Sequence, residues 1–163
     1  MREAIAAHLG SRQVSRVLYG SIIGLALIVA LEAHPPSAGT VVAALLGTAV
    51  AVGLAELYSE IVGTETRTHH RIERTTLAEF ADDAVAVTFG VCFPAVFFVL
   101  AALDAICSDT AFTVARWSGL GLIGFYGYAA GRLAGARPLA CVVQALAVAA
   151  IGGVLIAIKA LIH

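Results

Sequence analysis

Long apolar runs separated by short polar stretches make up most of this chain. Each run is continuous and lacks the period-two alternation of a membrane-spanning strand. A run of about 20 apolar residues is long enough for a helix that crosses a bilayer. The pattern predicts an all-α integral membrane bundle of five transmembrane helices in a single domain, residues 1–163. The predicted spans are residues 16–32, 40–62, 84–105, 112–134 and 139–161.

The polar stretches predict how the spans are joined. Residues 3–14 place Ile5 and Leu9 on one side of a helix and charged residues elsewhere, which is typical of a short interfacial helix on the membrane surface. Residues 63–83 are the longest polar segment and are predicted to form a cytoplasmic loop. Pro94, inside the third run, predicts a kink.

The composition supports lipid as the solvent. Of 163 residues, 60% are hydrophobic and 13% are charged, whereas soluble domains average about 45–50% and about 25%. The net charge of −1 gives no basic surplus for binding nucleic acid. The three scattered cysteines, Cys92, Cys107 and Cys141, provide neither a disulfide framework nor zinc-ligand spacing.

The basic residues predict the orientation in the membrane. Of the ten, eight lie before the first span or in the stretches on the same side, and only Arg116 and Lys159 lie on the other side. Because basic residues accumulate on the cytoplasmic side, the N-terminus is predicted in the cytoplasm and the C-terminus outside. Abundant alanine and glycine favour a bacterial plasma membrane.

Two carboxylates, Glu56 and Glu60, lie near the end of the second span. Their spacing of four puts them on one helix face, and at about 1.5 Å per residue Glu56 is still inside the bilayer. An ionisable side chain there costs about 2.5–3.5 kcal/mol unless it faces a partner or water. Hard divalent cations prefer oxygen ligands, so the pair predicts a cation or proton site at the cytoplasmic mouth. The alternative is that both acids pair with Arg67 or Arg71 at the interface.

A second group of candidate metal ligands lies in the polar segment. If the second helix continues beyond the membrane, Glu65, His69 and Glu73 recur at every fourth position and form one stripe. This stripe predicts a place where a metal ion is captured. The same residues also fit a solvated helix supported by acid–base pairs. Asp82 and Asp83, which open the third run, need only a helix-capping role.

Glycines recur at spacings that favour close helix packing. Gly20 and Gly24 mark one face of the first span, and Gly127, Gly131 and Gly135 mark one face of the fourth. The sequence contains no G-x-S-x-G, no HExxH and no phosphate-binding loop. Neither enzymatic activity nor a bound cofactor is therefore expected.

The chain resembles the vacuolar iron transporter family and its bacterial relatives. The likeness lies in five predicted spans, the orientation, the acidic end of the second span (AELYSE, 55–60) and the closing segment (GGVLIAIKALIH, 152–163). The resemblance implies a homodimer with acidic residues along the ion path and a metal-binding cytoplasmic segment after the second helix. The family's first helix carries an acid beside a glycine, where this chain has Tyr19. The residues to which the resemblance extends a metal-site role are Glu56, Glu60, Glu65, His69 and Glu73.

The expected function is membrane transport of divalent metal cations such as Fe²⁺ or Mn²⁺, in exchange for protons. The metal is then cargo, and the expected partners are the lipid bilayer and a second copy of the chain. Two alternatives remain open. One is a non-transporting membrane subunit or scaffold of a larger complex, and the other is a proton or small-ion channel that uses the same carboxylates.

Overall fold

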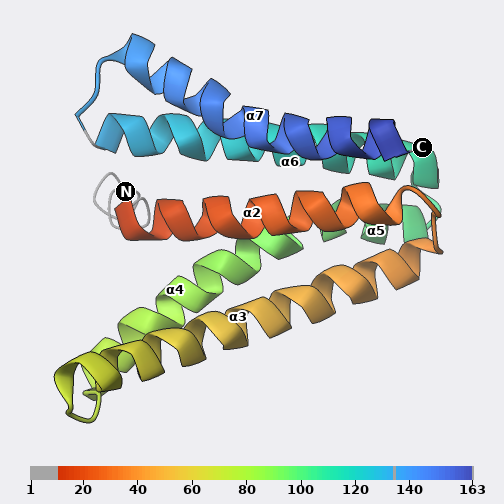
Figure 1. Ribbon diagram of the computed structural model, residues 1–163. Coiled ribbons are helices and arrows are strands. Elements are labelled where there is room, and N and C mark those ends of the chain that lie inside the picture. The colour runs from red at the N-terminus through yellow and green to blue at the C-terminus, as the bar shows by residue number, and fades with distance from the viewer. Residues whose placement is uncertain (1–10, 134, 163) are drawn as a thin grey trace.

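A computed structural model describes residues 11–133 and 135–162 of the chain. Within these ranges all regular secondary structure is helical (Figure 1), which confirms the all-α class. The helices are α2 (Ser11–Leu31), α3 (Ala38–Thr68), α4 (Arg74–Cys92), α5 (Ala95–Ala102), α6 (Ser108–Leu133) and α7 (Pro138–Ile162).

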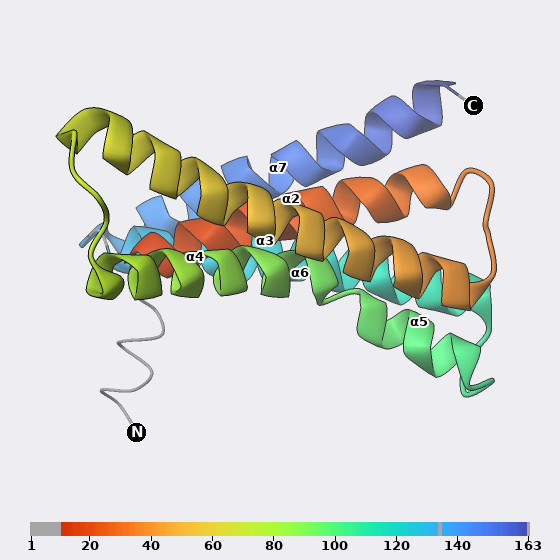
Figure 2. The ribbon, with the colours of Figure 1, turned by 90° about the horizontal axis from the view of Figure 1, so that it is seen from below.

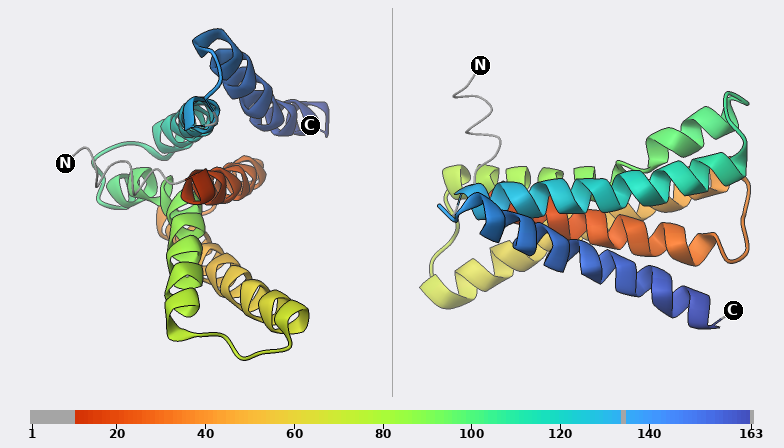
Figure 3. Two further views of the ribbon diagram at one scale, coloured as in Figure 1. Left: turned by 90° about the vertical axis from the view of Figure 1, so that its left-hand side faces the viewer. Right: turned by 90° about the horizontal axis from the view of Figure 1, so that it is seen from above.

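Helix α2 lies in the middle of the bundle, with α6 and α7 on one side and α3 and α4 on the other (Figure 1). Successive helices run in opposite directions, except that α5 follows α4 after a bend. The start of α2, loop 69–73 and the α6–α7 turn therefore lie at one end, which we call the Arg16 end. Loops 32–37 and 103–107 lie at the other, the Glu32 end. Helices α3 and α4 splay apart toward loop 69–73 (Figures 2 and 3).

Local chemistry sets the ends of α2 and α3. Pro35 and Pro36 cannot continue α2, and Ser37 caps α3 because its hydroxyl oxygen accepts a hydrogen bond from the Thr40 N–H at 3.3 Å. Helix α3 ends where His69 adopts a left-handed φ of 56°. This backbone reversal fixes the direction of loop 69–73.

Apolar side chains of α2, α3, α5 and α6 form the main core near the Glu32 end. Phe98 of α5 and Phe112 of α6 meet edge to face there, with ring centroids 4.7 Å apart. Ile28 of α2 and Leu45 of α3 are fully buried in the same cluster. The core therefore fixes four helices at the end opposite Arg16.

Helices α2 and α4 pack backbone to backbone through glycines. A Cβ on Gly24 would lie 2.9 Å from the Val91 carbonyl oxygen, and a Cβ on Gly90 would lie 2.7 Å from the Ser21 backbone nitrogen. A Cβ on Gly20 would overlap the α4 backbone outright. The predicted packing role of Gly20 and Gly24 is thus confirmed, and Gly90 supplies the opposing surface.

The structure contains two to three candidate membrane spans rather than five confirmed ones. Residues Gln13–Leu31 of α2 and the whole of α3 are each long and apolar enough to cross a membrane. The α4–α5 pair is a third candidate, bent by 48° where Pro94 lies, which confirms the predicted kink. Helices α6 and α7 have 26 and 25 residues. Over its described residues α6 is not apolar enough to be a candidate span, whereas α7 has an apolar stretch, Pro138–Ala147, that is shorter than a span. Arg116 lies inside α6, and the glycines and tyrosines around it contribute little hydropathy.

Residues 63–83 are not the loop that was predicted, because most of that segment is helix. Helix α3 continues to Thr68, and the connection to Arg74 of α4 is only residues 69–73. Threonine is often found where a helix ends, because its hydroxyl competes for backbone hydrogen bonds. Here the Thr66 hydroxyl donates to the Val62 carbonyl oxygen of the same helix at 2.7 Å, and the helix continues. The third run accordingly starts ten residues earlier than the predicted 84. The predicted interfacial helix 3–14 lies mostly outside the described residues.

Helix α3 keeps most of its apolar surface uncovered. Only 22% of its most apolar stretch is buried within the protein. Leu46, Val50, Leu54 and Tyr58 recur at every fourth position on its exposed face. Apolar surface of this length suggests a membrane protein whose helices contact the lipid bilayer.

Candidate functional site

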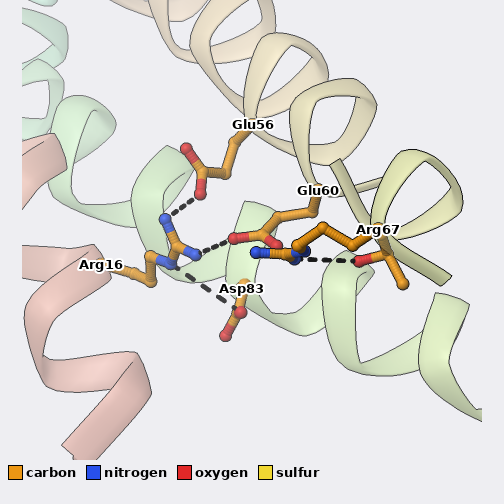
Figure 4. Close-up of polar contacts among 6 residues, drawn as sticks. Arg16, Glu56, Glu60, Arg67 and Asp83 are labelled. Atoms are coloured by element: carbon orange, nitrogen blue, oxygen red, sulfur yellow. Dashed lines mark hydrogen bonds and ion pairs between the residues drawn. The ribbon is translucent and has the colours of Figure 1, made fainter. Parts of the chain in front are cut away.

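Arg16 of α2 is the centre of a charged cluster at the Arg16 end of the bundle. Its Nη1 atom is ion-paired with Oε1 of Glu56, and its Nη2 atom with Oε1 of Glu60, both on α3. Its Nε atom lies 3.8 Å from Oδ2 of Asp83 on α4 (Figure 4). One guanidinium therefore joins three helices through three carboxylates.

The glycine packing between α2 and α4 positions this cluster. Arg16, Gly20 and Gly24 recur at every fourth position, so they share the face of α2 that meets α4. On α4, Asp83 lies seven residues, about two turns, before Gly90 and near the same face. Because the two backbones are in contact at the glycines, Arg16 and Asp83 emerge beside one another at the next turns.

Helix α3 packs on α4, and this contact positions its two glutamates in the cluster. Gly53 is buried against α4, where an added Cβ would overlap the Thr88 hydroxyl. That hydroxyl donates to the Ala49 carbonyl oxygen of α3 at 3.4 Å. Three and seven residues after Gly53, Glu56 and Glu60 leave α3 on the side that faces α2. The face of α3 that packs on α4 at Gly53 therefore also carries the two glutamates of the charged cluster.

The cluster is largely shielded from solvent. The side chain of Asp83 is 5% exposed, and those of Glu56, Glu60 and Arg16 are 15%, 21% and 23% exposed. Glu56 and Glu60 share one guanidinium, and Asp83 has contacts beyond Arg16. When both glutamates are ionised, the pair carries one more negative charge than Arg16 neutralises. One positive charge is thus shared between two carboxylates of the same helix.

The sequence correctly placed Glu56 and Glu60 on one inward face of α3, but their partner was not foreseen. They pair with Arg16, and neither Arg67 nor Arg71 takes that place. The Arg67 side chain extends back along α3 toward Glu60, and its guanidinium donates to the Thr64 hydroxyl at 3.5 Å (Figure 4). The guanidinium of Arg16 lies between the two carboxylates (Figure 4).

The predicted stripe of Glu65, His69 and Glu73 is wrong. The helix ends at Thr68, His69 turns the chain, and Glu73 is the N-terminal cap residue of α4. Glu65 and His69 do line one shallow surface hollow, whereas Glu73 does not reach it. Within residues 11–133 and 135–162, no three His, Cys, Asp or Glu side chains are grouped so that they could hold a metal ion.

Arg16 and Asp83 are the site residues that sequence reasoning missed. Asp83 was predicted to cap a helix, but α4 begins at Arg74, so Asp82 and Asp83 lie more than two turns inside it. A signal for Arg16 was present in the sequence. It lies four residues before Gly20, on the face that the glycines already marked for helix contact.

The Glu32 end carries a simpler ion pair. Nη1 of Arg116 on α6 lies 3.0 and 3.1 Å from the two carboxylate oxygens of Glu32, just after α2. Both side chains are about three-quarters shielded. This ion pair joins the end of α2 to α6.

No protein-family model, curated protein or solved structure matches the chain. The resemblance to the vacuolar iron transporter family therefore stays a prediction, and the function must be argued from the residues of the site.

Proposed function

We propose that this protein is a membrane transporter of small cations, and that the Arg16 cluster is its ion-binding site. The proposed cargo is a divalent metal such as Fe²⁺ or Mn²⁺. The observation that supports this most is the shared guanidinium: two shielded glutamates of one helix have a single base between them. Carboxylate oxygens are the ligands that hard divalent cations prefer.

In this proposal Arg16 is a resident cation that competes with the cargo. A metal ion binds Glu56 and Glu60 only when the guanidinium withdraws, and Arg16 returns when the metal leaves. The shielded carboxylates are thus never left without positive charge, which would cost several kcal/mol. Protons can take the same place, so proton exchange is the proposed coupling.

The proposed topology has five membrane-crossing helices, with α4 and α5 as one bent span. Helices α6 and α7 complete it, because they have the length of a span and run alongside α2 (Figure 1). Seven basic residues of the described chain lie at the Arg16 end, and two, Arg116 and Lys159, lie in the half of the bundle toward the Glu32 end. By the positive-inside rule, the Arg16 end faces the cytoplasm.

The direct test is metal flux into proteoliposomes. Glu56→Gln and Glu60→Gln should each abolish Mn²⁺-dependent quenching of a trapped dye, because each removes a proposed ligand charge. Asp109→Asn is the matched control, since Asp109 is an exposed acid at the Glu32 end and should retain flux. Arg16→Gln should bind Mn²⁺ more tightly in a thermal-shift titration, because the competing cation is gone. Undiminished flux in Glu56→Gln would remove the proposal.

A second candidate is a non-transporting membrane subunit. The feature that favours it is that Arg16 already pairs with both glutamates and links three helices through ion pairs without any metal. The long exposed face of α3 then serves a partner subunit or a second copy of the chain, and homodimerisation is likewise a proposal. This candidate predicts no stabilisation by divalent cations, whereas a hundredfold excess over the Kd should stabilise a metal-binding protein by about 2.7 kcal/mol. Proton flux without metal binding would instead indicate a proton channel.

A further inference from the structure

A cavity of about 240 Å³ lies between α2, α4 and α6, next to the charged cluster but separate from it. Its lining residues come from one face of each helix: on α4, Asp82, Val85 and Phe89 follow one another at helical spacing. Arg16, Glu56 and Glu60 are not among the described lining residues. A ligand here would therefore use different side chains from those of the proposed ion site.

Polar and apolar groups are separated along this cavity. Gln13 of α2 and Asp82 of α4 lie toward the loop 69–73 side, and Phe89 lies two turns, or roughly 10 Å, further along α4. Val85 and Phe89, 67% and 48% exposed, leave the flank of the cavity open. The cavity thus offers a carboxylate at one end, an apolar wall along its length and access from the side.

We propose that this cavity binds a small lipophilic ammonium cation, with its charge beside Asp82 and its apolar group along Val85 and Phe89. A carboxylate next to apolar surface favours a cationic ligand over a neutral one. The aromatic rings of Phe89 and Tyr126, both lining the cavity, add apolar surface against which the hydrocarbon part of such a ligand can pack.

The donor set argues against a metal ion at this position. Ca²⁺ needs six to eight oxygen ligands and Mg²⁺ a near-octahedral shell. The lining residues supply one carboxylate, one amide and one phenol among apolar side chains. The volume lies just below the range of about 300–1,000 Å³ of sites for drug-sized ligands, so a compact organic cation suits it.

Benzyltrimethylammonium is the probe, measured by equilibrium dialysis against the full-length protein in nanodiscs of an uncharged galactolipid, which carries no ammonium group that could compete. We expect saturable binding of one cation per chain. Asp82→Asn should raise the Kd at least tenfold, which corresponds to about 1.4 kcal/mol. Asp109→Asn, the matched control at the other end of the bundle, should leave the Kd unchanged. The uncharged isostere neopentylbenzene should not displace the cation.

Two further variants keep the outcome unambiguous. Val85→Trp fills the open flank of the cavity without removing a charge, so it should also abolish binding if the cavity is the site. This variant tests the proposal even if Asp82→Asn purifies poorly. Glu56→Gln should bind the ammonium ion normally, so failure of the metal-transport proposal would leave this one standing. Absence of saturable binding, an unchanged Kd in Asp82→Asn, or equal displacement by the isostere would each overturn the proposal.

Discussion

The contact between α2 and α4 can be tested by adding a single methyl group to Gly90. The Cβ of an alanine there would lie 2.7 Å from the Ser21 backbone nitrogen and 2.9 Å from the Gly20 carbonyl carbon. Real Cβ atoms essentially never approach other atoms closer than 3.0 Å. Because the opposing atoms belong to the α2 backbone, no side-chain rotation relieves the overlap. The two helices must move apart.

Gly47 provides a matched control for this substitution. It lies inside α3, and nothing occupies the space within 4 Å of an added Cβ. Replacing glycine by alanine inside a helix is worth up to about 1 kcal/mol from helix propensity alone, so Gly47→Ala should be neutral or slightly stabilising. At Gly90 an overpacking cost of about 1–3 kcal/mol opposes that gain.

The two alanine variants should therefore differ in free energy of unfolding by about 2 kcal/mol, with Gly90→Ala the less stable. For a chain of this size the difference corresponds to roughly 4–8 °C in Tm. Circular dichroism during thermal unfolding in one detergent measures it directly. If Gly90→Ala unfolds at or above the wild-type temperature, or if Gly47→Ala is equally destabilised, the backbone contact between α2 and α4 is not as described.

Two further predictions concern the Glu32 end. The Thr110 hydroxyl hydrogen-bonds to Sγ of Cys107 at 2.9 Å and lowers the pKa of that thiol below its ordinary value. Cys107 should therefore react with a membrane-impermeant maleimide at a lower pH than an ordinary thiol, while buried Cys141 remains unlabelled by peptide mass spectrometry; half-maximal labelling of Cys107 at the ordinary thiol pH would contradict this. Glu32→Gln and Arg116→Gln should each lower the Tm, and the double variant should lower it by less than the sum. A double-mutant cycle should give a coupling of roughly 0.5–1 kcal/mol, and strict additivity would argue against the ion pair.

The helical architecture follows from local sequence signals that act within a few residues. The kink at Pro94 and the packing faces of Gly20 and Gly24 were predicted and are found in the structure. Each of these features depends on residues that are close together in the chain, so a single sequence is enough to predict it. The boundary of the polar segment was misjudged for the opposite reason. Hydropathy marks where lipid would end, whereas α3 continues to Thr68 because its backbone and threonine hydroxyls stay satisfied in water.

The candidate site was only half predictable, because its members come from helices far apart in sequence. The spacing of Glu56 and Glu60 on one helix identifies them as a pair, but not what they face. Arg16 and Glu60 are 44 positions apart, and no local pattern joins them. Their contact follows from the three-dimensional path of α2, α3 and α4. A glycine face on α2 indicated a neighbouring helix without identifying it as α4.

The two ends of the bundle differ in the number of acids that meet one base, and this difference bears on the proposed ion site. At the Glu32 end, the ion pair of Glu32 with Arg116 joins the end of α2 to α6. At the other end, α3 brings two glutamates to a single arginine, although shielding makes each additional carboxylate costly. A fold that required only a fixed helix contact could omit one of those glutamates and lose little. The proposed transport function accounts for their joint presence by an exchangeable positive charge between them, which a fixed helix contact alone does not require.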